Sequence, residues 1–114
     1  MHRYARQTKL SGVGEPGQLR IANARIDVPL DGLAGEVAAR YLAGAGVGRL
    51  RVRTARIAAA ARSVDPAVFV DVSESLPPAV IGPSTLQDRS AQDVERGARF
   101  ALDALRAVIE GGPS

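Results

Sequence analysis

Arginine side chains offer the most chemistry in this 114-residue chain, because arginine carries nearly all of its positive charge and the net charge is +3. In the densest basic stretch, arginine alternates with apolar residues, so Arg49, Arg51 and Arg53 share one face of an expected strand. The near absence of lysine indicates arginine-biased composition rather than a phosphate-binding surface. Nucleic-acid binding usually adds stacking aromatics or a recognition motif, and the sequence shows neither. We therefore expect no nucleic-acid partner.

The remaining reactive residue types lack the neighbours that catalysis needs. Cysteine is absent, which excludes disulfides, thiolate zinc sites and a cysteine nucleophile. His2 stands alone near the N-terminus, without a carboxylate or a second histidine at ligand spacing. Asp65, Asp71 and Glu74 suit solvated strand ends better than a carboxylate cluster, because the sequence indicates no pocket around them. We predict no metal site and no catalytic residue among these side chains.

Length and composition indicate a single domain with an aliphatic core. The chain is long enough to bury one core, and its apolar residues are mainly Ala, Val, Leu and Ile, with only two Tyr and two Phe. The polar, basic residues 1–9 lack the apolar run of a signal peptide, and no apolar stretch is long enough to span a bilayer. We expect a cytoplasmic protein without a membrane partner.

Periodicity predicts strands that alternate with helices. The expected elements, in order, are an N-terminal arm and helix over 1–22, a strand over 24–28, a helix over 33–45, a strand over 49–53, a short helix over 57–61, a strand over 67–72, an irregular connection over 73–89 and a C-terminal helix over 90–111. This alternation favours an α/β fold with a parallel sheet and right-handed crossovers.

Five short motifs follow one another in the first half of the chain: Arg3-Tyr4-Ala5-Arg6-Gln7, Gly14-Glu15-Pro16-Gly17-Gln18, Ala24-Arg25-Ile26, Tyr41-Leu42-Ala43 and Ala45-Gly46-Val47-Gly48. Their order and spacing resemble the start of ThiF/MoeB-type activating enzymes, a family similar to ubiquitin-activating enzymes. The resemblance is strongest over residues 3–52. It implies that residues 1–114 form one truncated, degenerate, Rossmann-like three-layer domain with a short, mainly parallel sheet, from which the middle of the family's catalytic domain is missing.

The family's nucleotide-binding glycine loop reads Leu30-Asp31-Gly32-Leu33-Ala34-Gly35 here. If a cofactor binds at all, the resemblance implies that Gly32 and Gly35 are its binding residues, because loop glycines let backbone amides approach phosphates. Leu30 adds a side chain at the tight turn, and Asp31 adds a negative charge near where phosphates would lie. A strand-to-helix turn with close helix packing also explains both glycines without any ligand.

Other parts of the family's adenylation machinery have no counterpart in the chain. Thr54 and Arg56 occupy the positions of the two acids that hold ribose and magnesium in the family. The phosphate-stabilising lysine, the catalytic aspartate, the zinc-binding Cys-x-x-Cys pairs and the acceptor cysteine have no matching positions. Adenylation depends on positioning and charge stabilisation, so we expect no ATP or magnesium cofactor and no independent adenylyltransferase activity.

One functional residue of the family has a counterpart in the N-terminal arm. The second arginine of the Arg-Tyr-x-Arg-Gln motif crosses the family's dimer interface and contacts phosphates in the partner's site, and that position is Arg6 here. A guanidinium suits such a contact because it is permanently charged and offers a fork of donors. A solvated or structurally paired arginine on an arm is the alternative.

The resemblance predicts a pseudoenzyme that acts as a dimerisation or regulatory partner, with itself or with an intact ThiF/MoeB-like relative, in activation of a ubiquitin-like or sulfur-carrier protein. Two alternatives stay open. In the first, Gly32 and Gly35 still bind ATP and a partner completes an adenylyltransferase site. In the second, the chain is a self-associating structural module in which the arm and the final helix bury an apolar surface.

Overall fold

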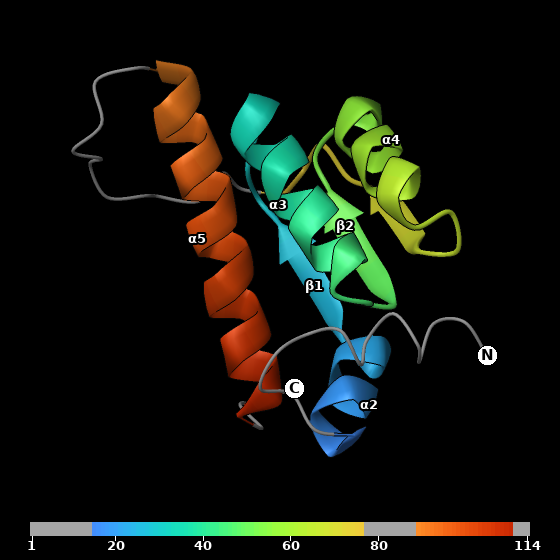
Figure 1. The fold of residues 1–114 in the computed structure, drawn as a ribbon. Helices are drawn as coiled ribbons and strands as arrows, with labels where there is room; N and C mark the ends of the chain where they lie inside the picture. Colours follow the sequence, from blue (N-terminus) through green and yellow to red (C-terminus); the bar gives the residue numbers. More distant parts are fainter. Residues whose placement is uncertain (1–14, 77–88, 111–114) are drawn as a thin grey trace.

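Three short parallel strands form the sheet of the computed structural model, which describes residues 15–76 and 89–110 (Figure 1). They follow the order β1-β2-β3 across the sheet and comprise β1 (Arg25–Val28), β2 (Arg49–Val52) and β3 (Phe69–Val72). Both neighbouring pairs are parallel. The expected α/β class and short parallel sheet are therefore confirmed.

Four helices accompany the sheet in the described ranges: α2 (Glu15–Asn23), α3 (Gly32–Gly44), α4 (Ala55–Val64) and α5 (Arg89–Ile109). In Figure 1, α3 lies between α4 and α5, in front of the strands. Helix α2 contacts α5, and Arg20 Nη1 donates a hydrogen bond of 2.8 Å to the Ile109 carbonyl. This bond joins the first described helix to the last turn of α5.

The two faces of the sheet differ in what covers them. Ile26, Leu50 and Val70 are neighbours in register and lie on the helix side, where each is at most 8% exposed. Asp27 and Arg51 lie on the opposite face and are exposed. Both strand-to-strand connections move to the next strand in the same direction across the sheet. Because such connections are right-handed, their helices α3 and α4 lie on the same face of the sheet. The described part therefore has two layers, whereas three were expected.

Helix α3 ends where a glycine permits a left-handed turn. Gly46 has a φ of 96°, which residues with a Cβ rarely adopt. The backbone N–H groups of Gly46 and Val47 donate to the carbonyls of Ala43 and Leu42 over 3.0 and 3.1 Å. These two bonds satisfy carbonyls that the helix end would otherwise leave without partners.

Helix α4 and strand β3 have boundaries that differ from the sequence expectation for local structural reasons. Helix α4 is longer than the alanine run over 57–61, because polar residues at both ends continue it; Ser63 Oγ donates a 2.6 Å hydrogen bond to the Ala60 carbonyl. Strand β3 begins two residues later than expected. Asp65 forms a turn there, since its Oδ1 accepts from the Ala67 N–H and its carbonyl accepts from the Val68 N–H.

The core lies between the sheet and the helix layer. Its largest fully buried side chains belong to Ile21, Val28, Leu42, Val47, Leu50, Val52 and Ile57. Helix α5 approaches α3 at Gly97, where an added Cβ would lie 2.8 Å from the Val37 Cβ. Within residues 15–76 and 89–110, no helix combines the length and the apolar character needed to cross a membrane.

Candidate functional site

The carboxyl ends of the three strands meet at one edge of the sheet, which is where ligands bind in open α/β sheets. The segment Pro29–Asp31 leads from β1 into α3, Arg53 and Thr54 lead from β2 into α4, and Ser73–Leu76 follows β3. We call these segments, together with Gly32 and Gly35 at the start of α3, the strand-end site. It contains most positions at which the chain departs from the family pattern.

Arg53 connects all three strand ends. Its Nε lies 2.7 Å from Asp31 Oδ1 in the loop after β1, and its Nη1 donates a hydrogen bond to the Leu76 carbonyl after β3. The Arg53 side chain is only 20% exposed, whereas that of Asp31 is 57% exposed. The Arg53 guanidinium thus donates hydrogen bonds to groups of the same chain. These contacts lie at the edge of the sheet where a nucleotide would have to bind.

The two loop glycines each have a structural explanation. Gly32 has a φ of 59° with no atom near the place of a Cβ, so its backbone conformation, rather than crowding, favours glycine. Gly35 is crowded instead: an added Cβ would meet the Leu30 carbonyl and lie 2.6 Å from Ile57 Cδ1. The Gly35 N–H also donates to the Asp31 carbonyl over 3.2 Å. Gly35 therefore lets α3 pack closely against the preceding loop and α4.

Leu30 and Asp31, which depart from the family's glycine loop, both make contacts within the chain. Leu30 is only 5% exposed and belongs to the core. Asp31 precedes α3 in extended conformation, but its side chain caps no helix N–H group and pairs with Arg53 instead. A helix N-terminus attracts anions, and here the Asp31 carboxylate, paired with Arg53, already lies next to it.

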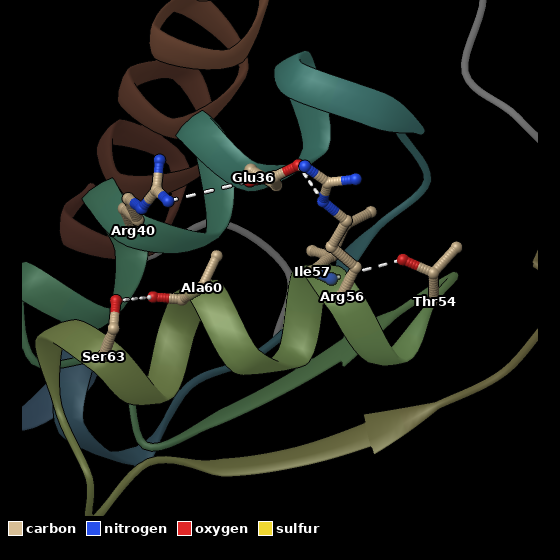
Figure 2. Close-up of polar contacts among 7 residues, drawn as sticks. All are labelled: Glu36, Arg40, Thr54, Arg56, Ile57, Ala60 and Ser63. Atoms are coloured by element: carbon tan, nitrogen blue, oxygen red, sulfur yellow. Dashed lines mark hydrogen bonds and ion pairs between the residues drawn. The ribbon is translucent and has the colours of Figure 1, made fainter.

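Thr54 and Arg56 hold α4 in place. Thr54 Oγ1 accepts a 3.2 Å hydrogen bond from the Ile57 N–H and so caps the helix (Figure 2). Arg56 Nε lies 3.2 Å from Glu36 Oε2 on α3, and the other oxygen of Glu36 lies 3.6 Å from Arg40 Nη2 (Figure 2). Neither position supplies a carboxylate, so this donor set does not fit magnesium and ribose.

The other candidates of the sequence analysis do not join this site. Asp65 is buried in its own turn, and Asp71 lies on the exposed face of the sheet. Across residues 15–76 and 89–110, no group of three His, Asp or Glu side chains is arranged to hold a metal ion. Arg6 and His2 lie outside the described residues.

The ion pair between Asp31 and Arg53 was not predicted from the sequence. A signal for it exists: opposite charges follow two strands that were expected to be parallel neighbours, and the carboxyl ends of such strands share an edge. The alternating pattern instead predicts that Arg53 shares a strand face with Arg49 and Arg51. In the structure, β2 ends at Val52, and Arg53 belongs to the strand-end site.

Fold and site together define a small Rossmann-like α/β unit whose strand-end site is filled by its own side chains. No family model matches the chain. A 50-residue segment is 50% identical to the adenylyltransferase and sulfurtransferase MOCS3 of Anopheles gambiae, and it covers 44% of this chain and 11% of that protein. The resemblance to ThiF/MoeB-type enzymes is therefore confirmed for this segment. The chain matches only about a ninth of the length of that relative.

Proposed function

We propose that the chain is a ThiF/MoeB-like pseudoenzyme that acts as a dimerisation or regulatory partner in activation of a ubiquitin-like or sulfur-carrier protein, in the cytoplasm. The segment similar to MOCS3 supports the connection to such a pathway. The ion pair between Asp31 and Arg53 supports the loss of catalysis. It lies at the edge of the sheet at which a nucleotide would bind.

Charge balance at the strand-end site supports the same proposal. A triphosphate needs cationic or N–H donors that point at it, together with a metal ion held by carboxylates. Arg53 directs its donors to Asp31 and to the Leu76 carbonyl, and Arg56 pairs with Glu36. At this edge, ATP would compete for Arg53 with the Asp31 carboxylate and the Leu76 carbonyl.

Calorimetric titration with ATP and magnesium tests the absence of nucleotide binding. We expect no heat of binding and no shift in melting temperature at millimolar ATP. An intact ThiF/MoeB-like enzyme in the same buffer is the positive control. Saturable binding of ATP to the wild-type chain would contradict the pseudoenzyme proposal and favour the alternative in which a partner completes an adenylyltransferase site.

Donation of Arg6 in trans is part of the same proposal and rests on the family motif alone. Pyrophosphate exchange by an intact ThiF/MoeB-like relative, measured with and without this chain, tests it. We expect stimulation by the wild-type chain, a loss with Arg6→Ala and no loss with Arg3→Ala as the matched control. Equal exchange rates in all mixtures would remove the arginine-donor role.

A second candidate function, self-association, is favoured by an uncovered flank of α5. Val94 and Leu102 are 44% and 53% exposed, and each is four residues from the partly buried Ala98. Residues at this spacing follow one another along one side of a helix. Because the row reads large-small-large in both directions, an antiparallel second copy would set Val94 against Leu102 of the second copy, with Ala98 at the twofold axis.

Charges beside this row fit the same arrangement. Glu95 Oε2 and Arg99 Nη2 lie 3.6 Å apart next to Ala98, so an antiparallel copy would bring each acid near the arginine of the other helix. The row covers only about two helical turns. A contact of this length buries less than the roughly 800 Å² per partner of a stable interface. A dimer through α5 alone would therefore be weak and concentration-dependent.

A single-cysteine variant tests this arrangement cleanly, because the chain contains no cysteine. Ala98→Cys should form a covalent dimer on mild oxidation, whereas Ala59→Cys, at an exposed position of α4, serves as the matched control. Sedimentation should show a dimer equilibrium that Leu102→Glu abolishes. A monomer at millimolar concentration, with no more disulfide at position 98 than in the control, would contradict self-association through α5.

A further inference from the structure

The sheet face opposite α3 and α4 is the least expected feature of the fold. Parallel sheets are usually covered on both faces, but none of the helices in residues 15–76 and 89–110 packs on this one. Charged side chains and one aromatic ring stand on it. We call this surface the open sheet face and define it by Arg25, Asp27, Arg49, Arg51, Phe69 and Asp71.

One row across the open sheet face is positively charged. Arg25, Arg49 and Phe69 are neighbours in register, so two like charges stand side by side on adjacent strands. Such a pair is destabilising without a counter-charge. The Arg49 guanidinium lies 4.4 Å from the centre of the Phe69 ring, which leaves its N–H edges available. Among the residues that the structure describes, neither arginine forms an ion pair.

The next row has the opposite character. Arg51 Nη1 lies 3.7 Å from Asp27 Oδ2, and Asp71 is the register neighbour of Arg51 on the other side. Two carboxylates therefore flank one arginine. Residues of both rows, Arg25, Arg49, Arg51 and Asp71, line a hollow on this face. An anion that binds here is attracted by the first row and repelled by the second, so its position along the strands is defined.

Size and charge pattern together select the kind of ligand. Three strands about 4.8 Å apart with a rise of about 3.3 Å per residue give a face only some 10 Å on each side. This area suits a short segment rather than a whole protein interface. Asp27 and Asp71 interrupt the basic surface, so a continuous phosphate backbone cannot follow it. The exposed ring of Phe69, 53% accessible, offers an apolar contact beside the arginines.

We propose that the row of Arg25, Arg49 and Phe69 binds an acidic peptide segment of a partner protein, with carboxylates on the two guanidinium groups. Forked guanidinium donors match carboxylate geometry, and a carboxylate placed between the arginines relieves their repulsion. The proposal concerns the first residue of each strand, and these residues are not part of the strand-end site. It stands whether or not the pseudoenzyme proposal is correct.

NMR titration of the wild-type chain with a blocked hexaglutamate peptide at low salt tests the proposal directly. We expect saturable shifts at the amides of Arg25, Arg49 and Phe69, and an affinity that falls about tenfold when salt rises from roughly 0.05 to 0.3 M. The variant R25E/R49E should lose at least tenfold in affinity. R89E, an exposed charge reversal at the start of α5, should bind like the wild type.

Three outcomes would overturn the proposal. Chemical-shift changes confined to other surfaces would show that the peptide binds elsewhere. This result comes from the wild-type chain alone, so it does not depend on the folding of any variant. Tighter binding of single-stranded DNA than of hexaglutamate at equal salt would show a phosphate-backbone surface instead. Equal affinity for inorganic phosphate and for the peptide would show a site for a free anion, without contact to a peptide chain.

Discussion

Replacing Gly97 with alanine probes the contact that holds α5 in the fold. Gly97 lies on the buried side of α5, directly against α3. An added methyl group would meet the Ala34 carbonyl oxygen and would lie 2.8 and 3.0 Å from Val37 Cβ and Cγ1. Because the carbonyl belongs to the backbone of α3 and Cβ is fixed to it, neither atom can move away without displacing the helix.

Two opposing terms decide the sign of the effect. Alanine is favoured over glycine in a helix interior by about 1 kcal/mol. Overpacking a well-filled site costs about 1–3 kcal/mol, and rigid backbone neighbours put this site at the upper end. The net expectation is a loss of about 2 kcal/mol in the free energy of unfolding. For a chain of this size, such a loss lowers the melting temperature by very roughly 10 °C.

Gly44→Ala is the matched control for this prediction. Its added Cβ would meet only Val64 Cγ1 at 3.5 Å, an ordinary contact, so propensity should leave the variant as stable as the wild type or slightly more stable. Urea denaturation followed by circular dichroism measures both variants. If Gly97→Ala matches or exceeds the wild type in stability, α5 does not lie as close to α3 as described, and the reasoning is refuted.

Three further predictions concern the strand-end site and the core. Thr54→Ala should cost about 1 kcal/mol through loss of the α4 cap, whereas Thr54→Ser should keep most of it; thermal melts compare the two. A double-mutant cycle with Asp31→Ala and Arg53→Ala should give a coupling of about 0.5–1 kcal/mol that shrinks in 0.5 M salt; a coupling of zero would mean that the ion pair does not form. Leu50→Ala should cost about 2–5 kcal/mol, because the side chain is fully buried at the centre of the sheet; a smaller loss in urea denaturation would contradict that position.

Periodicity predicted the strands and helices well because apolar residues recur with the period of each element. The helix expected over 33–45 differs from α3 by one residue at each end, and Gly46 ends it as expected. The number of layers could not be predicted in the same way. Alternation along β1 and β2 shows that one face is polar, but it does not show whether a further element covers that face.

At the candidate site, sequence reasoning found the right positions and missed their contacts. Leu30, Asp31, Thr54 and Arg56 stood out as departures from the family pattern, and the sequence explained them only as losses of chemistry. The structure gives each a contact within the chain. Asp31 and Arg53 are 22 residues apart in the sequence, so their pairing depends on how β1 and β2 align. The periodicity of residue types along one strand does not give this alignment.

The side-chain contacts at the strand-end site can be understood from the small size of the sheet. Each strand has only four residues, so backbone pairing between neighbours is limited to short ladders. Arg53 adds a tie across all three strand ends, and the pair of Arg56 with Glu36 adds one between α3 and α4. Residues that bind a nucleotide need their hydrogen-bond donors and acceptors for the ligand. They therefore cannot also form contacts of this kind within the chain. In this chain the same positions stabilise the fold, so a substitution that frees Arg53 for phosphate would at the same time weaken the sheet that positions it.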